Sequence, residues 1–115
     1  MLKEVYTYME NKTISIDEQS IHFIVNTQER LKNFTGYPNL AKEYQFIIKN
    51  LIKGMLGGTN VNELVLNGAN DGYLIDNIYD LLDDFIDSSY SFTTLKTLML
   101  SILNNNELGY EFSIV

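Results

Sequence analysis

The sequence predicts an all-α domain, a single-domain bundle of about four to five short helices with room for a small β element at the C-terminal tail. Apolar residues recur at helical spacing in several segments, and Gly, Pro and Asn mark the loops between them. A third observation is a segment with apolar residues on one side and aspartates on the other. At 115 residues the chain fits one domain, 1–115, that is long enough to bury a core.

The first 33 residues predict two helices. A short first helix carries apolar residues at helical spacing, namely Leu2, Val5, Tyr6 and Met9. Ser15 and Glu18 stand three positions apart, as in a capping box that opens a second helix. The buried face of that helix is expected to hold Ile21, Ile24, Val25, Gln28 and Leu31. Because 13–16 and 21–25 are rich in β-branched residues, two short strands remain an alternative there.

A third helix is expected over about 40–56, with Asn39 as its N-cap and Gly57-Gly58 as its stop. The residues that share its core face at a period of 3.6 are Leu40, Tyr44, Ile47, Ile48, Leu51 and Met55. Residues 62–66 fit either a helical turn or a short strand.

The second half predicts two further helices and a docked tail. The fourth helix covers about 73–87, with Asn70 or Asp71 as its N-cap and an apolar side made of Leu74, Ile78, Leu81, Leu82 and Phe85. Ser91 is expected to cap a fifth helix, whose apolar residues are Leu95, Leu98, Met99, Ile102 and Leu103, and which ends at three asparagines, 104–106. Residues 109–115 alternate apolar and polar side chains, as a docked strand does.

Charge divides the chain into two halves. Residues 1–58 carry seven basic and six acidic side chains, a balance of +1, whereas 59–115 carry one lysine and nine acidic side chains, a balance of −8. The net charge of −7 repels nucleic-acid phosphates and anionic membranes, so we expect neither as a partner. The chain has no cysteine, its apolar runs are too short to span a bilayer, and no signal peptide is evident. We therefore expect a cytoplasmic protein, and its Asn-, Ile-, Lys- and Tyr-rich composition suggests a bacterium or a phage with an AT-rich genome.

The acidic side chains of the fourth predicted helix form a stripe. At 100° per residue, Asp76, Asp80, Asp83 and Asp87 lie within about 60° of one another, with Asp84 beside them. Like charges at this spacing cost a few tenths of a kcal/mol each, and those near the helix C-terminus oppose the helix dipole. The stripe is either a solvated face or a docking surface for a basic partner.

The third predicted helix offers a complementary basic face. Lys42, Lys49 and Lys53 share one side of this helix, and Phe46 falls among them. Phe46 is either an interface anchor or a residue covered by another element such as the C-terminal tail. The lysines could also face the aspartate stripe within the fold, in which case the stripe would be neutralised internally.

The sequence predicts no catalytic residue, no cofactor and no metal site. His22 is the only histidine, and with no cysteine there is little on which to build a zinc site or a nucleophilic triad. We interpret His22 as a surface or packing residue. Asp87-Ser88 followed by a helix resembles the acyl carrier protein segment that takes a phosphopantetheine arm. Ser89 departs from that family's apolar residue, so we interpret Ser88 as part of a helix–helix loop.

These observations favour a non-enzymatic acidic protein-interaction domain. The best interpretation is a stoichiometric inhibitor, either an immunity protein, an antitoxin or a phage-encoded inhibitor, that docks its acidic helix on a basic toxin or host enzyme. Carboxylates for this contact come from Asp76, Asp80, Asp83, Asp84 and Asp87, and apolar anchors from Tyr79 and Phe46. The alternative is a small helix-turn-helix regulator built from 15–52, and a third hypothesis is a small enzyme or carrier. Self-association is left open.

Overall fold

Helices dominate the computed structural model, which describes residues 13–33, 40–57, 73–106 and 109–115. In this part of the chain the element order is β1 (Thr13–Ile16), α2 (Glu18–Lys32), α3 (Leu40–Met55), α5 (Leu74–Asp87), α6 (Phe92–Leu103) and β2 (Glu111–Ile114). The predicted mostly helical fold with a small β element is confirmed. The helix expected near the N-terminus, the Asn39 cap and the ambiguous segment 62–66 lie outside the described residues.

The second predicted helix is α2, but its N-terminal cap differs from the prediction. The carboxylate of Asp17 accepts a hydrogen bond of 3.0 Å from the backbone amide of Gln19. The predicted cap, Ser15, instead lies in β1. The predicted buried face is confirmed, because Ile21, Ile24, Val25 and Gln28 are buried and Leu31 packs against the core. The alternative of a strand over 21–25 is therefore wrong, whereas the strand over 13–16 is present.

The core face of α3 is rotated from the predicted one. Ile48, Ile52 and Leu56 are fully buried, whereas Ile47, which was expected in the core, is exposed. The reason is that α3 packs against both α2 and α5, so its buried arc is centred between these two neighbours. Tyr44, Leu51 and Met55 lie at the edge of that arc and pack against the core from there.

Helices α5 and α6 correspond to the fourth and fifth predicted helices. Ser91 caps α6, since its hydroxyl accepts a hydrogen bond of 3.1 Å from the amide of Thr94. Ser88 is the C-cap of α5 and lies in the connection to α6, in line with the loop interpretation. At the other end, Tyr73 is the N-cap of α5 and its side chain makes no capping bond, while the expected cap residues Asn70 and Asp71 lie outside the described residues. Leu98, expected on the apolar face of α6, is exposed.

The two strands are far apart in the sequence and pair in parallel, with Ile14 opposite Phe112 and Ile16 opposite Ile114. The backbone carbonyl of Val115 then accepts a hydrogen bond from the amide of Glu18 at 2.9 Å, which ties the end of the tail to the start of α2. The docked tail strand is thus confirmed.

Two of the asparagines after α6 hold the tail strand in place. The side chain of Asn104 makes two hydrogen bonds to the backbone of Phe112. Its Oδ1 accepts a hydrogen bond of 2.7 Å from the Phe112 amide, and its Nδ2 donates one of 3.2 Å to the Phe112 carbonyl. The amide of Asn106, which is buried, donates to the carbonyls of Leu103 and Tyr110 at 2.9 Å each. The asparagine run therefore ends α6 and also fixes β2.

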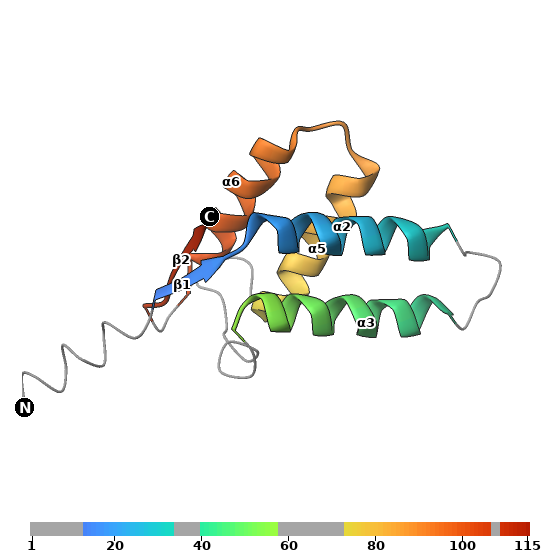
Figure 1. Cartoon of the computed structure of the whole chain (residues 1–115), viewed down its shortest axis with the longest axis horizontal. Helices are drawn as coiled ribbons and strands as arrows, with labels where there is room; N and C mark the ends of the chain where they lie inside the picture. Colours follow the sequence, from blue (N-terminus) through green and yellow to red (C-terminus); the bar gives the residue numbers. More distant parts are fainter. Residues whose placement is uncertain (1–12, 34–39, 58–72, 107–108) are drawn as a thin grey trace, which may run out of the picture.

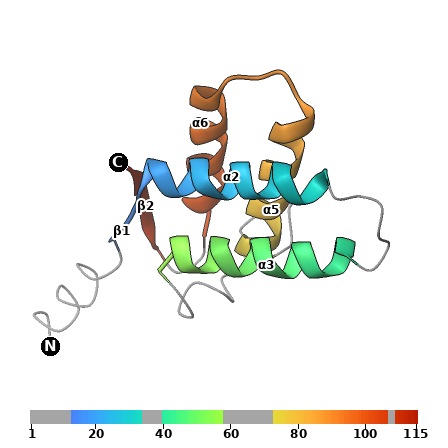
Figure 2. The same cartoon turned by 45° about the vertical axis from the view of Figure 1, so that its right-hand side comes forward.

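Figures 1 and 2 show the arrangement of these elements. Helix α3 returns along α2, so the two lie side by side in opposite directions, and α5 crosses behind them with α6 next to it. Apolar side chains from all six elements form one core. In a helix-turn-helix motif the two helices cross steeply, and the side-by-side packing of α2 and α3 has a different geometry.

Candidate protein-interaction surface

All five aspartates of the predicted stripe lie on α5, on the side of the helix that faces away from the core. Four are exposed, namely Asp76, Asp80, Asp84 and Asp87, and Asp83 is half-buried. The opposite side of α5 carries Leu74, Ile78 and Leu82, which are fully buried. The helix therefore presents a continuous row of carboxylates over about 16 Å of its length. We call these five residues the acidic face.

A lysine from α2 neutralises the C-terminal part of the acidic face. The ammonium of Lys32 lies 2.6 Å from a carboxylate oxygen of Asp83 and 3.3 Å from one of Asp87. Partial burial lowers the pKa of Lys32, but its hydrogen bonds to the two carboxylates outweigh that effect and raise the pKa above its usual value. The sequence analysis did not predict the ion pairs of Lys32 with Asp83 and Asp87, because they depend on how α5 crosses α2.

Behind that bridge lies a fully buried glutamine. The side-chain amide N–H of Gln28 donates a hydrogen bond of 3.2 Å to Asp83, while the amide oxygen of Gln28 is buried and has no hydrogen-bond partner among the described residues. Asp83 is thus held by two residues of α2, Gln28 and Lys32. Its carboxylate is the most constrained of the acidic face.

A lysine from α3 neutralises the N-terminal end of the acidic face. The ammonium of Lys49 lies 3.0 Å from a carboxylate oxygen of Asp76 and 5.5 Å from the centre of the Tyr79 ring. The suggestion that the basic face of α3 meets the aspartates within the fold therefore holds for Lys49. Lys53 makes no ion pair with any residue that the structure describes.

Two aspartates of the acidic face have no cation beside them in the part of the chain that the structure describes. Asp80 and Asp84 are exposed, and neither forms an ion pair with a residue in the described part of the chain. They lie four positions apart, so their carboxylates are neighbours on the helix surface. Burial, and to a lesser extent the negative charge of Asp84, raises the pKa of the nearby Tyr90 phenol. Within the described residues, Asp80 and Asp84 are therefore the part of the acidic face that is left unneutralised.

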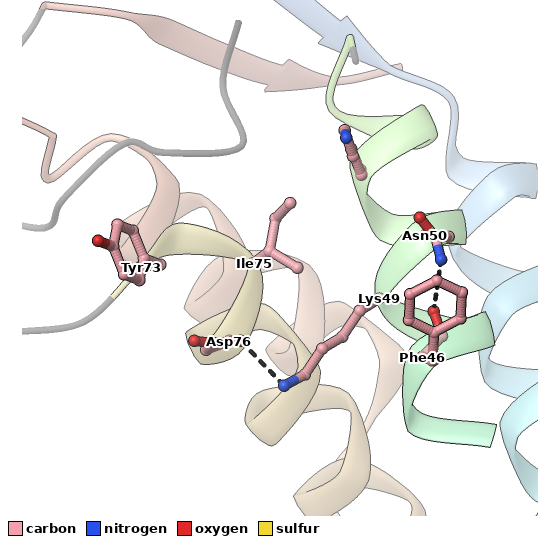
Figure 3. A pocket seen from close by; sticks show the side chains of 7 residues that line it. Phe46, Lys49, Asn50, Tyr73, Ile75 and Asp76 are labelled. Carbon is pink, nitrogen blue, oxygen red and sulfur yellow. Dashed lines mark hydrogen bonds and ion pairs between the residues drawn. The ribbon is translucent and has the colours of Figure 1, made fainter. Parts of the chain in front are cut away.

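An open cleft lies between α3 and the start of α5 (Figure 3). Its volume is about 420 Å³, and its lining consists of Phe46, Lys49, Asn50, Lys53, Tyr73, Ile75 and Asp76. Figure 3 shows Phe46 and Tyr73 on opposite sides of this space, while Lys49 extends from α3 to Asp76 on α5. The cleft thus joins the basic face of α3 to the first residue of the acidic face.

Phe46 stands on the α3 side of the cleft with 70% of its surface exposed. The alternative that the C-terminal tail covers it is wrong, because β2 packs against β1 and α6 at another site. The ring is therefore positioned at the surface, as an interface anchor would have to be.

Tyr79, which was predicted to be an apolar anchor for a partner, is buried within the fold. Only 6% of its surface is exposed, and its hydroxyl donates a hydrogen bond of 2.9 Å to the hydroxyl of Tyr44 on α3. Burial is the main reason that the pKa of Tyr79 is raised, and the hydrogen bond to Tyr44 adds to it. The prediction of Tyr79 as an exposed anchor is wrong, because α3 covers this side of α5. The spacing Ile75-Tyr79-Leu82-Ile86 is the sequence signal that could have indicated its burial.

His22 is a packing residue on the exposed side of α2, as expected. Its ring stacks on that of Phe92 with the centroids 3.9 Å apart, and its Nε2 lies 4.0 Å from a carboxylate oxygen of Glu18. Glu18 also receives the ammonium of Lys96 at 3.1 Å, which links α2 to α6. Among the described residues, no three His, Cys, Asp or Glu side chains are grouped so that they could hold a metal ion.

Comparison of the chain with protein-family models, with curated protein sequences and with solved structures found no match. None of the helices that the structure describes combines the length and the apolar character needed to cross a lipid bilayer.

Proposed function

We propose that this chain is a protein-interaction domain that acts by binding, and that the acidic face of α5 docks on a basic protein partner. The observation that carries the proposal is the pair Asp80 and Asp84, which are exposed and have no ionic partner among the described residues, while lysines of α2 and α3 hold the other three aspartates. Lys or Arg side chains of a partner would supply the missing cations.

Physical cost supports this assignment. Two like charges four positions apart destabilise a helix by a few tenths of a kcal/mol, and Asp84 also lies in the part of α5 where the helix dipole disfavours an anion. Contact with a basic partner removes both costs and accelerates association by electrostatic steering. Phe46, exposed on the neighbouring helix, is the apolar side chain that could add affinity at the edge of the contact.

Within this proposal, the specific form that we favour is a stoichiometric inhibitor in a bacterial cytoplasm. An acidic domain of this size can cover the basic nucleic-acid-binding site of an enzyme or the active surface of a basic toxin, as an immunity protein, an antitoxin or a phage-encoded inhibitor would. The second half of the chain, with one lysine and nine acidic side chains, has the charge that such a role requires.

The test is affinity capture from source-cell lysate with the wild-type chain, an Asp80→Asn/Asp84→Asn variant and a Glu29→Gln/Glu111→Gln variant. The control variant loses the same two charges, from exposed positions on α2 and β2. We expect a basic protein that the wild type and the control retain at low salt, that high salt releases, and that the Asp80→Asn/Asp84→Asn variant fails to retain.

Two results would contradict the proposal. Equal retention by all three baits would mean that the charge of Asp80 and Asp84 has no part in binding. Capture that is lost equally with both variants would indicate attraction by net charge alone, with no defined docking face. Circular dichroism of each variant excludes unfolding as the cause of a loss.

A further inference from the structure

The cleft between α3 and α5 has opposite charges on its two sides. On the α3 side stand Lys49 and Lys53, and on the α5 side stands Asp76, followed one turn later by Asp80. The Lys49–Asp76 ion pair crosses the cleft and cancels one charge from each side. What remains is Lys53 in the cleft lining and Asp80 on α5 one turn beyond it, and neither has an ionic partner in the part of the chain described.

The same surface carries one exposed aromatic ring on each side of the cleft. Phe46 is 70% exposed on the α3 side, and Tyr73 is 53% exposed on the α5 side. Exposed Phe and Tyr side chains beside a recess are typical of the centre of a protein–protein interface, where aromatic residues contribute most of the affinity. Charged residues around them act mainly through specificity and register.

The arrangement of Lys53 on α3 and of Asp76 and Asp80 on α5 determines which kind of surface can bind over the cleft. A uniformly basic surface placed over the cleft would meet Lys53, and a uniformly acidic one would meet Asp76 and Asp80. A surface that carries both charges in the reverse order avoids both repulsions, and a two-fold rotation about an axis through the cleft produces such a surface from the chain itself. An axis placed midway between Lys53 and Asp80 sets Lys53 of each copy opposite Asp80 of the other, on a surface whose recess is lined by Phe46 and Tyr73.

We propose that two copies of this chain form a symmetric dimer through the cleft, with Phe46 and Tyr73 within the interface and reciprocal Lys53–Asp80 ion pairs across it. The proposal is independent of the basic partner proposed above. The dimer uses Asp80, so it would also compete with that partner for part of the acidic face.

The test is sedimentation velocity of the full chain at physiological ionic strength over the micromolar concentration range. Four variants are compared with the wild type: Lys53→Glu, Asp80→Lys, the double variant Lys53→Glu/Asp80→Lys, and Glu29→Lys as a control. Glu29 is exposed on α2 and lies outside the cleft lining, so its replacement changes net charge as Asp80→Lys does without touching the surface in question.

The expected result is a concentration-dependent dimer of the wild type that each single cleft variant weakens by about tenfold or more and that the double variant restores. Asp80→Lys is the decisive case. It makes an acidic chain less acidic, so general repulsion between copies predicts tighter association, whereas loss of the specific ion pair predicts weaker association. Glu29→Lys should leave the dimer unchanged or strengthen it.

Replacement of Phe46 gives a second, independent readout. Phe46→Ala removes an exposed ring, so it should leave the fold intact, and it should raise the dimer dissociation constant by about tenfold or more. A chain that stays monomeric throughout the concentration range overturns the proposal. So does an Asp80→Lys variant that associates as the Glu29→Lys variant does, or a double variant that fails to recover. None of these results bears on capture of a basic partner, which is measured separately.

Discussion

The hydroxyl of Tyr79 donates a hydrogen bond of 2.9 Å to the hydroxyl of Tyr44, and this contact joins α5 to α3 beside the Lys49–Asp76 ion pair. Tyr79 is buried, whereas Tyr44 is half-buried. The bond thus fixes the spacing between the helix that carries the acidic face and the helix that carries Phe46. The two partners differ in burial, and their replacement should have unequal effects.

Tyr44→Phe should destabilise the fold more than Tyr79→Phe does. The first change leaves the buried hydroxyl of Tyr79 without its acceptor, at a cost of about 1–3 kcal/mol. The second removes that hydroxyl and leaves Tyr44 close enough to solvent to be hydrated, at a cost of about 0.5–1.5 kcal/mol. Urea denaturation of both variants measures the difference, and a larger loss for Tyr79→Phe would contradict the assigned donor and acceptor.

Alkaline pH should destabilise the wild type more steeply than Tyr79→Phe. Burial raises the pKa of Tyr79 in the folded state, so the stabilising contribution of its neutral phenol is fully present below the unfolded pKa of about 10. As the pH rises further, the unfolded chain loses this proton first, and the free energy of unfolding falls. The raised pKa of Lys32 has the same sign. Chemical denaturation at a series of alkaline pH values should give parallel curves for the two proteins if the assignment is wrong.

Replacement of Gln28 by methionine should leave the stability of the chain within about 1 kcal/mol of the wild type. The buried amide oxygen of Gln28 has no hydrogen-bond partner among the described residues, so its removal relieves a desolvation cost of about 1–3 kcal/mol, and the lost hydrogen bond to the Asp83 carboxylate is worth about as much. Asp83 keeps Lys32 at 2.6 Å. Gln28→Glu is the isosteric control, and it should destabilise because it buries a second carboxylate beside Asp83. A loss of more than about 2 kcal/mol for Gln28→Met, measured by thermal unfolding, would show that the oxygen is satisfied in solution.

Lys32→Gln should cost about 0.5–1 kcal/mol, whereas Lys53→Gln should leave stability nearly unchanged. Lys32 bridges Asp83 and Asp87, whose carboxylates repel each other once it is removed, while Lys53 has no ionic partner in the described part of the chain. The loss of stability in Lys32→Gln is small because Asp87 is largely exposed to solvent. Added salt should reduce the difference between the two variants in urea denaturation, and a difference independent of salt would point to packing of the lysine stem instead.

Local patterns predicted most of the helical fold. The buried faces of α2 and α5 follow from apolar spacing, and the Ser91 cap follows from a hydroxyl residue placed before an apolar run. Such signals are carried within one element. The parallel pairing of β1 with β2 joins residues 98 positions apart, as between Ser15 and Ser113, and no local pattern encodes that pairing. The Ser15 cap was wrong for this reason, since the strand takes up that residue.

The sequence predicted which aspartates form the acidic face, but it did not predict which of them have a lysine partner. The sequence places five carboxylates on one side of a helix, and the structure confirms this placement. Which of them are neutralised depends on the crossing of α5 over α2 and α3, which brings in Lys32 and Lys49 from elements far away in sequence. The same crossing buries Tyr79. The spacing of residues along a helix predicts on which side of the helix each side chain lies. Which other element covers that side depends on tertiary packing.

The rate of association with the captured basic partner, measured by stopped flow over a range of ionic strength, tests the central claim most directly. For the wild type and for Glu29→Gln/Glu111→Gln the rate constant should fall steeply as salt increases, because unneutralised carboxylates steer the encounter. For Asp80→Asn/Asp84→Asn the rate should be several-fold lower at low salt and nearly independent of it. If the three proteins show the same salt dependence, the acidic face of α5 is a solvated surface and the partner binds elsewhere.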